Sequence, residues 1–214
     1  MDIDKQDGLI RAGLALNARR LLTQYAELDL PQDRRYDVTL CLSVIQMLLA
    51  NSVEWAIATN NTSKREAWLA PLEEPVSRVL AYPGALEKDS FPDDSRDTLE
   101  VLTHLRNALS HPRMKDTNPP TTGYTTNSDY LGLITSVTFT DSPDYNTKGT
   151  PKAEGDRHKH RGKHYIGPPR IFTIRLDVQQ LSALAIALAE RLSEGVPDSH
   201  SQEISLDRAA SLAR

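Results

Sequence analysis

The feature that most constrains this chain is a long apolar stretch, VTLCLSVIQMLLANSVEWAIA, at residues 38–58. It forms most of a helix predicted over residues 33–58, and its apolar side chains point in nearly every direction around that helix. A helix of this kind has to lie inside a hydrophobic core rather than on its surface. With 214 residues, the chain is long enough to bury such a core within one domain.

Further helices are predicted around this central one from apolar residues at helical spacing. Their expected bounds are residues 6–28, 64–82, 94–110 and 178–195, the segment 64–82 being broken by Pro71 and Pro75. The segment PDDSRD supplies capping residues before the helix at 94–110, and Asp177 with Gln180 forms a capping box before the last helix. The predicted fold class is therefore mainly α, a bundle of four to five helices.

A small β-structure is predicted before the last helix. LITSVTFTD and IFTIRLDV alternate between apolar and polar residues, which indicates an inserted, antiparallel two-stranded ribbon. The segments YPGALEKDSFPDD and KDTNPPTTGYTTNSDY are predicted to form loops and turns. One domain is thus expected over residues 1–195, with a β-ribbon and a basic loop inserted at 113–177 and a polar C-terminal tail at 196–214.

The segment VLTHLRNALSHPRM, residues 101–114, carries a group of polar side chains at the end of the helix predicted over 94–110. At about 100° per residue, the leucines of this helix share one face and the polar residues form a strip beside it. The strip contains Glu100, Thr103, His104, Arg106, Asn107, Ser110 and His111. Pro112 disfavours helical geometry at His111, so we expect its imidazole at a helix end within reach of Arg106.

These residue types suit chemistry at a phosphodiester. The negative end of the helix dipole favours protonated His111, and a histidine that titrates near neutrality can move protons. The Arg106 guanidinium can hold a phosphate through two parallel hydrogen bonds. Glu54 lies inside the apolar run, where it either faces solvent, joins a structural ion pair, or points at this Arg–His cluster.

The hexapeptide RNALSH, residues 106–111, resembles the R-x(4–6)-H motif of HEPN domains in the form where a polar residue follows the arginine. HEPN domains are helical, and the motif lies near a helix end in them as well. The resemblance covers residues 6–112 and 178–195 and implies a HEPN-like bundle. It also implies a metal-independent endoribonuclease, often a toxin or a phage-defence effector, in which two motifs share one cleft of a homodimer.

For such an enzyme, the resemblance implies RNA as the substrate and no cofactor or metal. His111 would move protons between the 2′-OH and the 5′-oxygen, while Arg106 would hold the scissile phosphate. Asn107 would orient the histidine or bind the phosphate, and Ser110 and His104 are supporting candidates. The expected products carry a 2′,3′-cyclic phosphate and a 5′-OH.

One position departs from the family pattern. Some HEPN toxins have a tyrosine two residues after the histidine, which a partner nucleotidyltransferase modifies, whereas this chain has Arg113 there. The sequence therefore does not support neutralisation by that route. An antitoxin or defence-system partner of another kind stays a candidate.

A second candidate site is the Gly- and Pro-rich segment between the two predicted strands. Residues 148–170 hold seven Lys or Arg side chains and two acids, on a chain whose net charge is −4. Such local positive charge suits contact with RNA phosphates, and a tyrosine can stack on a base. The candidate RNA-binding residues are Arg113, Arg157, Lys159, Arg161, Lys163 and Tyr165. A solvated loop without a ligand, or weak metal binding by His158, His160 and His164, are the alternatives.

Two other functions stay open: a non-catalytic HEPN-fold module that binds RNA, nucleotides or a protein, and a helical interaction protein with an accidental motif. A single cysteine, Cys41, excludes an internal disulfide and a multi-cysteine zinc site, and its apolar surroundings predict a buried, inert thiol. The N-terminal MDIDKQDG lacks a signal-peptide core, and no apolar run reaches the roughly 20 residues of a membrane span. A cytoplasmic protein without a membrane partner is therefore expected.

Overall fold

The structure, a computed structural model, describes residues 3–29, 37–58, 61–82, 84–89, 97–110, 122–130, 132–144, 158–160, 163–165 and 170–193. These residues form five helices and six strands, so the prediction of a mainly helical chain is confirmed. The helices are α1 (Ile3–Glu27), α2 (Asp37–Ala58), α3 (Thr62–Ala81), α4 (Thr98–Ser110) and α5 (Val178–Ser193). Among the described residues, no helix is long and apolar enough to cross a membrane.

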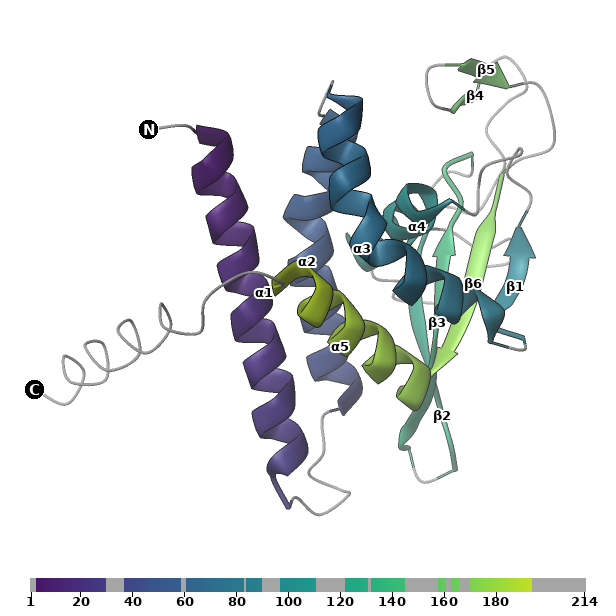
Figure 1. Cartoon of the computed structure of the whole chain (residues 1–214). Helices are drawn as coiled ribbons and strands as arrows, with labels where there is room; N and C mark the ends of the chain where they lie inside the picture. The colour runs from purple at the N-terminus through teal and green to yellow at the C-terminus, as the bar shows by residue number, and fades with distance from the viewer. Residues whose placement is uncertain are drawn as a thin grey trace, which may run out of the picture.

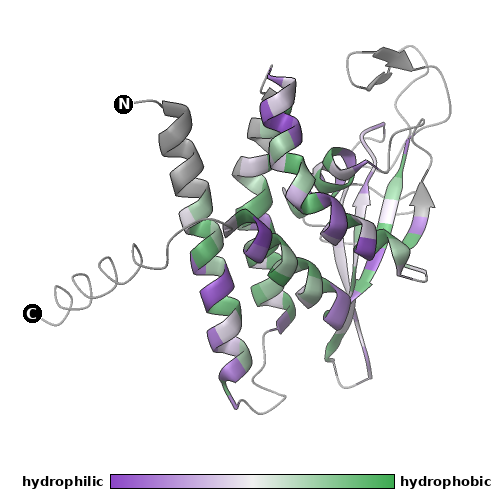
Figure 2. Cartoon of the chain, in the orientation of Figure 1, coloured by the Kyte–Doolittle hydropathy of each residue, from purple (hydrophilic) through white to green (hydrophobic). Residues whose placement is uncertain are grey.

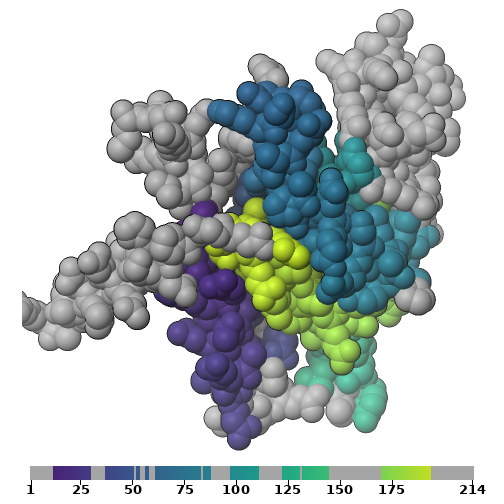
Figure 3. All heavy atoms as spheres, viewed as in Figure 1, coloured from purple at the N-terminus to yellow at the C-terminus, as the bar shows by residue number. Residues whose placement is uncertain are grey.

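The helices form one body with an antiparallel sheet at the side away from α1 (Figure 1). Helix α5 packs against α1, α2 and α3, and α4 packs against α2 and the sheet. In the space-filling view, α3 and α5 cover the interior from the side shown (Figure 3). Helix α5, the last helix among the described residues, therefore closes the bundle that the earlier helices begin.

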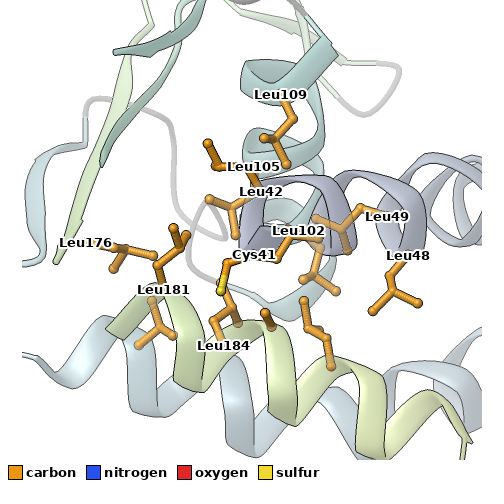
Figure 4. Packing of buried hydrophobic residues seen from close by; sticks show 14 of the residues in the cluster. Cys41, Leu42, Leu48, Leu49, Leu102, Leu105, Leu109, Leu176, Leu181 and Leu184 are labelled. Carbon is orange, nitrogen blue, oxygen red and sulfur yellow. The ribbon is translucent and has the colours of Figure 1, made fainter. Parts of the chain in front are cut away.

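The apolar run of α2 lies in the hydrophobic core, as predicted for a helix without a polar face. Its residues Val44, Ile45 and Leu49 are at most 2 % exposed. Leucine side chains of α2, α4 and α5 meet there with Leu176 from the sheet (Figure 4). Hydrophobic residues dominate α5, whereas hydrophilic residues recur along α1 and α3 (Figure 2).

Cys41 of α2 belongs to this core and is 3 % exposed, so the prediction of a buried cysteine is confirmed. Burial raises the pKa of the Cys41 thiol above its ordinary value. A hydrogen bond with Ser182 lowers that pKa by less than burial raises it, and the charge of Asp37 raises it further. The side chain therefore stays a neutral thiol at neutral pH and packs as a small apolar group.

Two helices begin at the side-chain caps that the sequence predicts. Asp97 Oδ1 accepts a hydrogen bond from the Glu100 backbone N–H at 2.9 Å, which caps α4. The capping box of α5 is complete: Gln180 N–H donates to Asp177 Oδ1 at 2.8 Å. In return, Asp177 N–H donates to Gln180 Oε1 at 2.9 Å. Each cap satisfies backbone donors that the first helical turn leaves without a helical partner.

Four strands form the antiparallel sheet, in the order β1-β6-β3-β2. Their bounds are β1 (Leu86–Asp89), β2 (Gly123–Ser128), β3 (Ile134–Asp141) and β6 (Phe172–Asp177). Two short strands, β4 (His158–His160) and β5 (Lys163–Tyr165), pair with each other in a separate hairpin. The predicted antiparallel pairing of the two alternating segments is confirmed, since Ser136–Asp141 of β3 pair with all of β6.

The register of β3 against β6 puts apolar side chains of both strands on one face. Val137 lies opposite Leu176, and Phe139 lies opposite Ile174. All four side chains are at most 1 % exposed and belong to the same core as the helices. Helices α4 and α5 pack against these strands, so the sheet and the bundle share their buried surface.

The predicted two-stranded ribbon is wrong in its extent, because the sheet has four strands. Strand β1 comes from YPGALEKDSFPDD and β2 from KDTNPPTTGYTTNSDY, both of which were expected to form loops or turns. These edge strands are short and largely polar, so they lack the apolar alternation that identifies a strand. Strand β1 forms by backbone pairing with β6, which is distant in sequence, whereas β2 forms a hairpin with the strand that follows it, β3.

The predicted break at Pro71 and Pro75 is also wrong, because α3 continues from Thr62 to Ala81. Each proline removes one backbone N–H donor, which costs a helix interior about 3 kcal/mol. Tertiary packing offsets this cost, because one side of α3 lies in the core. The buried residues of α3 are Leu72, Pro75, Val76 and Val79.

A buried ion pair joins the two chain positions that flank residues 145–169. Asp144 is 2 % and Arg170 is 4 % exposed. The Arg170 guanidinium donates to both carboxylate oxygens, each at 2.7 Å, and its backbone N–H donates to Oδ2 at 2.8 Å. This bidentate geometry holds the chain just after β3 to the chain just before β6.

Arg170→Met should lower the free energy of unfolding by about 3–5 kcal/mol, because it leaves the Asp144 charge buried without its cation. The double variant Arg170→Met/Asp144→Leu should recover part of that loss, since it leaves no unpaired charge. As a control, Arg78→Met breaks the exposed Arg78–Glu74 pair of α3 and should cost less than about 1 kcal/mol. Urea unfolding measures all three, and equal stability of Arg170→Met and Arg78→Met would contradict the prediction.

Candidate active site

Helix α4 carries the candidate site and uses the predicted apolar face. Leu102, Leu105 and Leu109 are at most 2 % exposed and lie in the core. Val101 and Ala108 are buried as well, because α4 packs against α2 and α3 and also against β2 and β3. Its polar strip is therefore not a free surface, and part of it faces other elements of the fold.

His104 shows this burial most clearly, since it is only 2 % exposed. Its Nδ1 lies 2.8 Å from Oδ2 of Asp141, which is 4 % exposed. Its ring stacks on Phe172, with centroids 4.4 Å apart and an interplanar angle of 20°. Asp141 and Phe172 lie opposite each other in the β3–β6 ladder, so one pair of sheet residues holds the imidazole.

Asn107 and Arg106 extend the same hydrogen-bond chain toward solvent. Asn107 Nδ2 donates to Asp141 Oδ2 at 3.0 Å, and Arg106 Nη1 donates to Asn107 Oδ1 at 3.0 Å. Both residues of α4 are half-buried, in contrast to His104. The chain thus runs from a buried carboxylate, through an amide, to a partly accessible guanidinium.

The second oxygen of the carboxylate binds the segment that leads into β2. Thr122 Oγ1 lies 3.3 Å from Asp141 Oδ1, and it also accepts the backbone N–H of Ser142 at 2.9 Å. Asp141 therefore receives hydrogen bonds from α4 and from the residue directly before β2 while it belongs to β3. A carboxylate is costly to bury unless such donors satisfy it.

The structure brings together three of the predicted site residues, namely Arg106, Asn107 and His104. Ser110 is exposed, and its hydroxyl donates to the Arg106 carbonyl oxygen at 2.9 Å. Its hydrogen bond is therefore to the backbone of its own helix and not to the other site residues. The Glu54 side chain lies outside the described part of the chain, although its backbone belongs to α2. The other predicted positions with side chains outside it are His111, Arg113, Arg157, Lys159, Arg161, Lys163 and Tyr165.

Sequence reasoning missed Asp141 and Thr122. For Asp141 a signal existed, because Val137, Phe139 and Asp141 follow the two-residue period of a strand and so share its apolar face. A carboxylate on such a face needs a polar partner from a facing element. For Thr122 no such signal existed, since its partners depend on the pairing of β2 with β3.

The chain was compared with protein families, curated proteins and solved structures. No family model, curated protein or solved structure matches it. The resemblance of RNALSH to the HEPN motif therefore stands on the residues themselves.

The described residues hold no group of three or more His, Cys, Asp or Glu side chains that could bind a metal ion. The site does contain the guanidinium of Arg106, a group whose geometry suits carboxylates and phosphates in general. A guanidinium has five N–H donors, of which Asn107 uses one in the hydrogen bonds described above. The amide of Asn107 also keeps one N–H and one lone pair beyond its bonds to Asp141 and Arg106.

His104→Phe should lower the free energy of unfolding by about 1–3 kcal/mol, because it keeps an aromatic ring against Phe172 but removes a donor from the buried Asp141. Ser110→Ala is a control on the same helix and should change stability by less than about 0.5 kcal/mol. Thermal or urea unfolding provides the comparison. His104→Phe with wild-type stability would show that the imidazole–carboxylate bond contributes nothing to folding.

Proposed function

We propose that this protein is a HEPN-type, metal-independent endoribonuclease that acts as a cytoplasmic homodimer, as a toxin or in phage defence. The observation that carries the proposal is the hydrogen-bonded pair of Arg106 and Asn107 in the last turns of α4. Helix α4 ends at Ser110, directly before the histidine of the RNALSH motif. In this proposal the five helices are a HEPN-like bundle, to which the four-stranded sheet is added.

The environment of Arg106 supports a role in holding phosphate. Its guanidinium is half-buried and bonded to an amide that is itself tied to a buried carboxylate. A guanidinium held in this way has lost much of its rotamer freedom before a ligand binds. Donors that are already oriented stabilise charge in a transition state better than mobile ones.

The proposed reaction uses the nucleophile that RNA itself carries. The 2′-oxygen forms a bond to phosphorus while the bond from phosphorus to the 5′-oxygen breaks, which gives a 2′,3′-cyclic phosphate. A base removes the proton of the 2′-OH, and an acid protonates the 5′-oxygen to give a 5′-OH. His111 is the residue for this proton transfer, and Arg106 offsets the negative charge that develops on the phosphoryl oxygens.

A homodimer fits this chemistry because the reaction needs a base and an acid at once. One imidazole cannot be neutral and protonated at the same moment, so two copies of His111 in a shared cleft would divide these tasks. Each copy would also bring Arg106, which lets one arginine bind the scissile phosphate and the other a neighbouring one. The basic segment around Arg157–Lys163 would contact further phosphates of the bound strand.

Purified wild-type protein should cleave single-stranded RNA in the presence of EDTA and leave 2′,3′-cyclic phosphate ends. His111→Ala should lower the rate at least about 100-fold, because a positioned acid–base group contributes about that much or more. Arg106→Ala should lower it by about 100- to 1,000-fold through lost charge stabilisation. DNA of the same sequence should not be cleaved, since it lacks the 2′-OH.

The matched control for Arg106→Ala is Arg78→Ala, which removes an exposed arginine of α3 and should keep the wild-type rate. Wild-type RNA cleavage by either His111→Ala or Arg106→Ala would overturn the proposal. Dimers that bind RNA without cutting it would favour the non-catalytic HEPN-fold module. A monomer in solution that ignores RNA would favour a plain helical interaction protein.

The basic segment should set the salt dependence of RNA binding. In a His111→Ala background, a variant with four substitutions to glutamine should lower the slope of log K against log salt by up to about 3, because each phosphate contact on a single strand contributes about 0.7. The four positions are Arg157, Lys159, Arg161 and Lys163.

A control variant neutralises four Lys or Arg residues elsewhere in the chain and should leave the slope unchanged. Its positions are Lys64, Arg65, Arg78 and Arg191. Equal slopes for the two variants would assign the basic segment to solvent rather than to RNA.

A further inference from the structure

The carboxylate of Asp141 is buried on the apolar face of β3, where an apolar side chain would be expected. Asp141 is the last residue of β3 and continues the apolar face of Val137 and Phe139. It is 4 % exposed, and donors from α4 and from Thr122 surround it. An apolar residue of similar size would extend the core at this position without requiring any hydrogen bond. Unlike an apolar residue, the carboxylate binds polar side chains of α4 by hydrogen bonds.

Its first effect is to fix the orientation of the Asn107 amide. An ionised carboxylate accepts hydrogen bonds and donates none, so the NH2 group of Asn107 has to face Asp141. The amide oxygen then has to face the other way, toward Arg106. The flipped amide would put oxygen against the carboxylate and NH2 against the guanidinium, and both contacts would be repulsive.

Its second effect is to fix the helix that carries Arg106. His104, three residues before Asn107, bonds the same Oδ2 atom that the amide bonds. The His104 ring also stacks on Phe172, the residue that pairs with Asp141 across the β3–β6 ladder. Rotation of α4 about its axis would break both the stack and the two bonds to Oδ2. The register of β3 against β6 thus determines the direction in which Asn107 and Arg106 project.

We infer that Asp141 is the positioning residue for Arg106 and acts through the Asn107 amide. The sheet thus contributes to the geometry of the site. The catalytic meaning of this inference rests on the function proposed above, whereas the orientation of Arg106 is a property of the folded chain. Asp141 touches no substrate in this scheme. It presents the guanidinium in one direction, and that direction favours phosphate binding in the transition state.

The orientation is measured without any substrate, from the exchange of guanidinium protons in NMR spectra of the full chain. Arg106→Lys identifies the Arg106 signals by removing them. Asp141→Asn replaces charge-assisted hydrogen bonds by weaker neutral ones, and it should speed the exchange of the Arg106 protons about tenfold. Asn107→Ala, at a half-buried position, should speed that exchange at least as much.

The kinetic half of the test is a double-mutant cycle on RNA cleavage. Asp141→Asn should lower kcat about tenfold and change KM by less than about twofold, because orientation matters most in the transition state. Asp141→Asn added to Asn107→Ala should cause no further loss, since the link to Arg106 is already absent. Losses that multiply would show that Asp141 acts by general stabilisation, and they would overturn the inference.

The matched control is Asp177→Asn, the same chemical change at the exposed end of β6, where an asparagine also caps a helix well. It should keep both the wild-type Arg106 exchange and the wild-type kcat. A wild-type exchange rate of the Arg106 protons in Asp141→Asn would overturn the inference, whatever the cleavage activity. If Asp141→Asn does not fold, a wild-type exchange rate in Asn107→Ala would overturn it. A wild-type protein without RNA cleavage, but with faster Arg106 exchange in both variants, would overturn the proposed function and leave the positioning role intact.

Discussion

The structure of the candidate site depends on the burial of one carboxylate, that of Asp141. A carboxylate at 4 % exposure is tolerated only where several donors replace its water. Here the donors are His104 and Asn107 from α4 and Thr122, the residue directly before β2. These donors come from α4 and from the residue before β2, while the acceptor belongs to β3. The carboxylate is fully hydrogen-bonded only when all three elements are in place. The carboxylate therefore couples the position of the helix to the pairing of the strands.

Two buried acids lie three residues apart and serve different ends of the fold. Asp141 binds polar side chains of α4, whereas Asp144 binds the Arg170 guanidinium in a bidentate pair. The first contact joins the sheet to the helical bundle, and the second joins the two positions that flank residues 145–169. Both acids therefore lie at or just beyond the end of β3, one in contact with α4 and the other with Arg170.

The parts of the fold that could be predicted from the sequence are those that local patterns determine. The burial of α2, the Asp177–Gln180 capping box and the pairing of β3 with β6 all follow from spacing within short segments. Strands β1 and β2 could not be predicted, because their short, largely polar segments lack the apolar alternation of a strand; β1 forms by pairing with the distant β6, and β2 forms by pairing with the neighbouring β3. The continuity of α3 through two prolines likewise depends on its packing against the core.

In the candidate site as well, some residues can be recognised from the local sequence and others cannot. The second group explains how a short motif gains a defined geometry. Arg106 and Asn107 are adjacent in sequence, and their pairing with a motif histidine can be proposed from the chain alone. Their orientation comes from Asp141, which lies 34 residues beyond Asn107 and belongs to another element. A free RNALSH peptide has the same functional groups, but nothing holds its amide or its guanidinium in one rotamer. Strand β3, which follows α4 in the sequence, supplies that constraint. The residues least explained by the HEPN resemblance are therefore the ones that orient the residues of the motif.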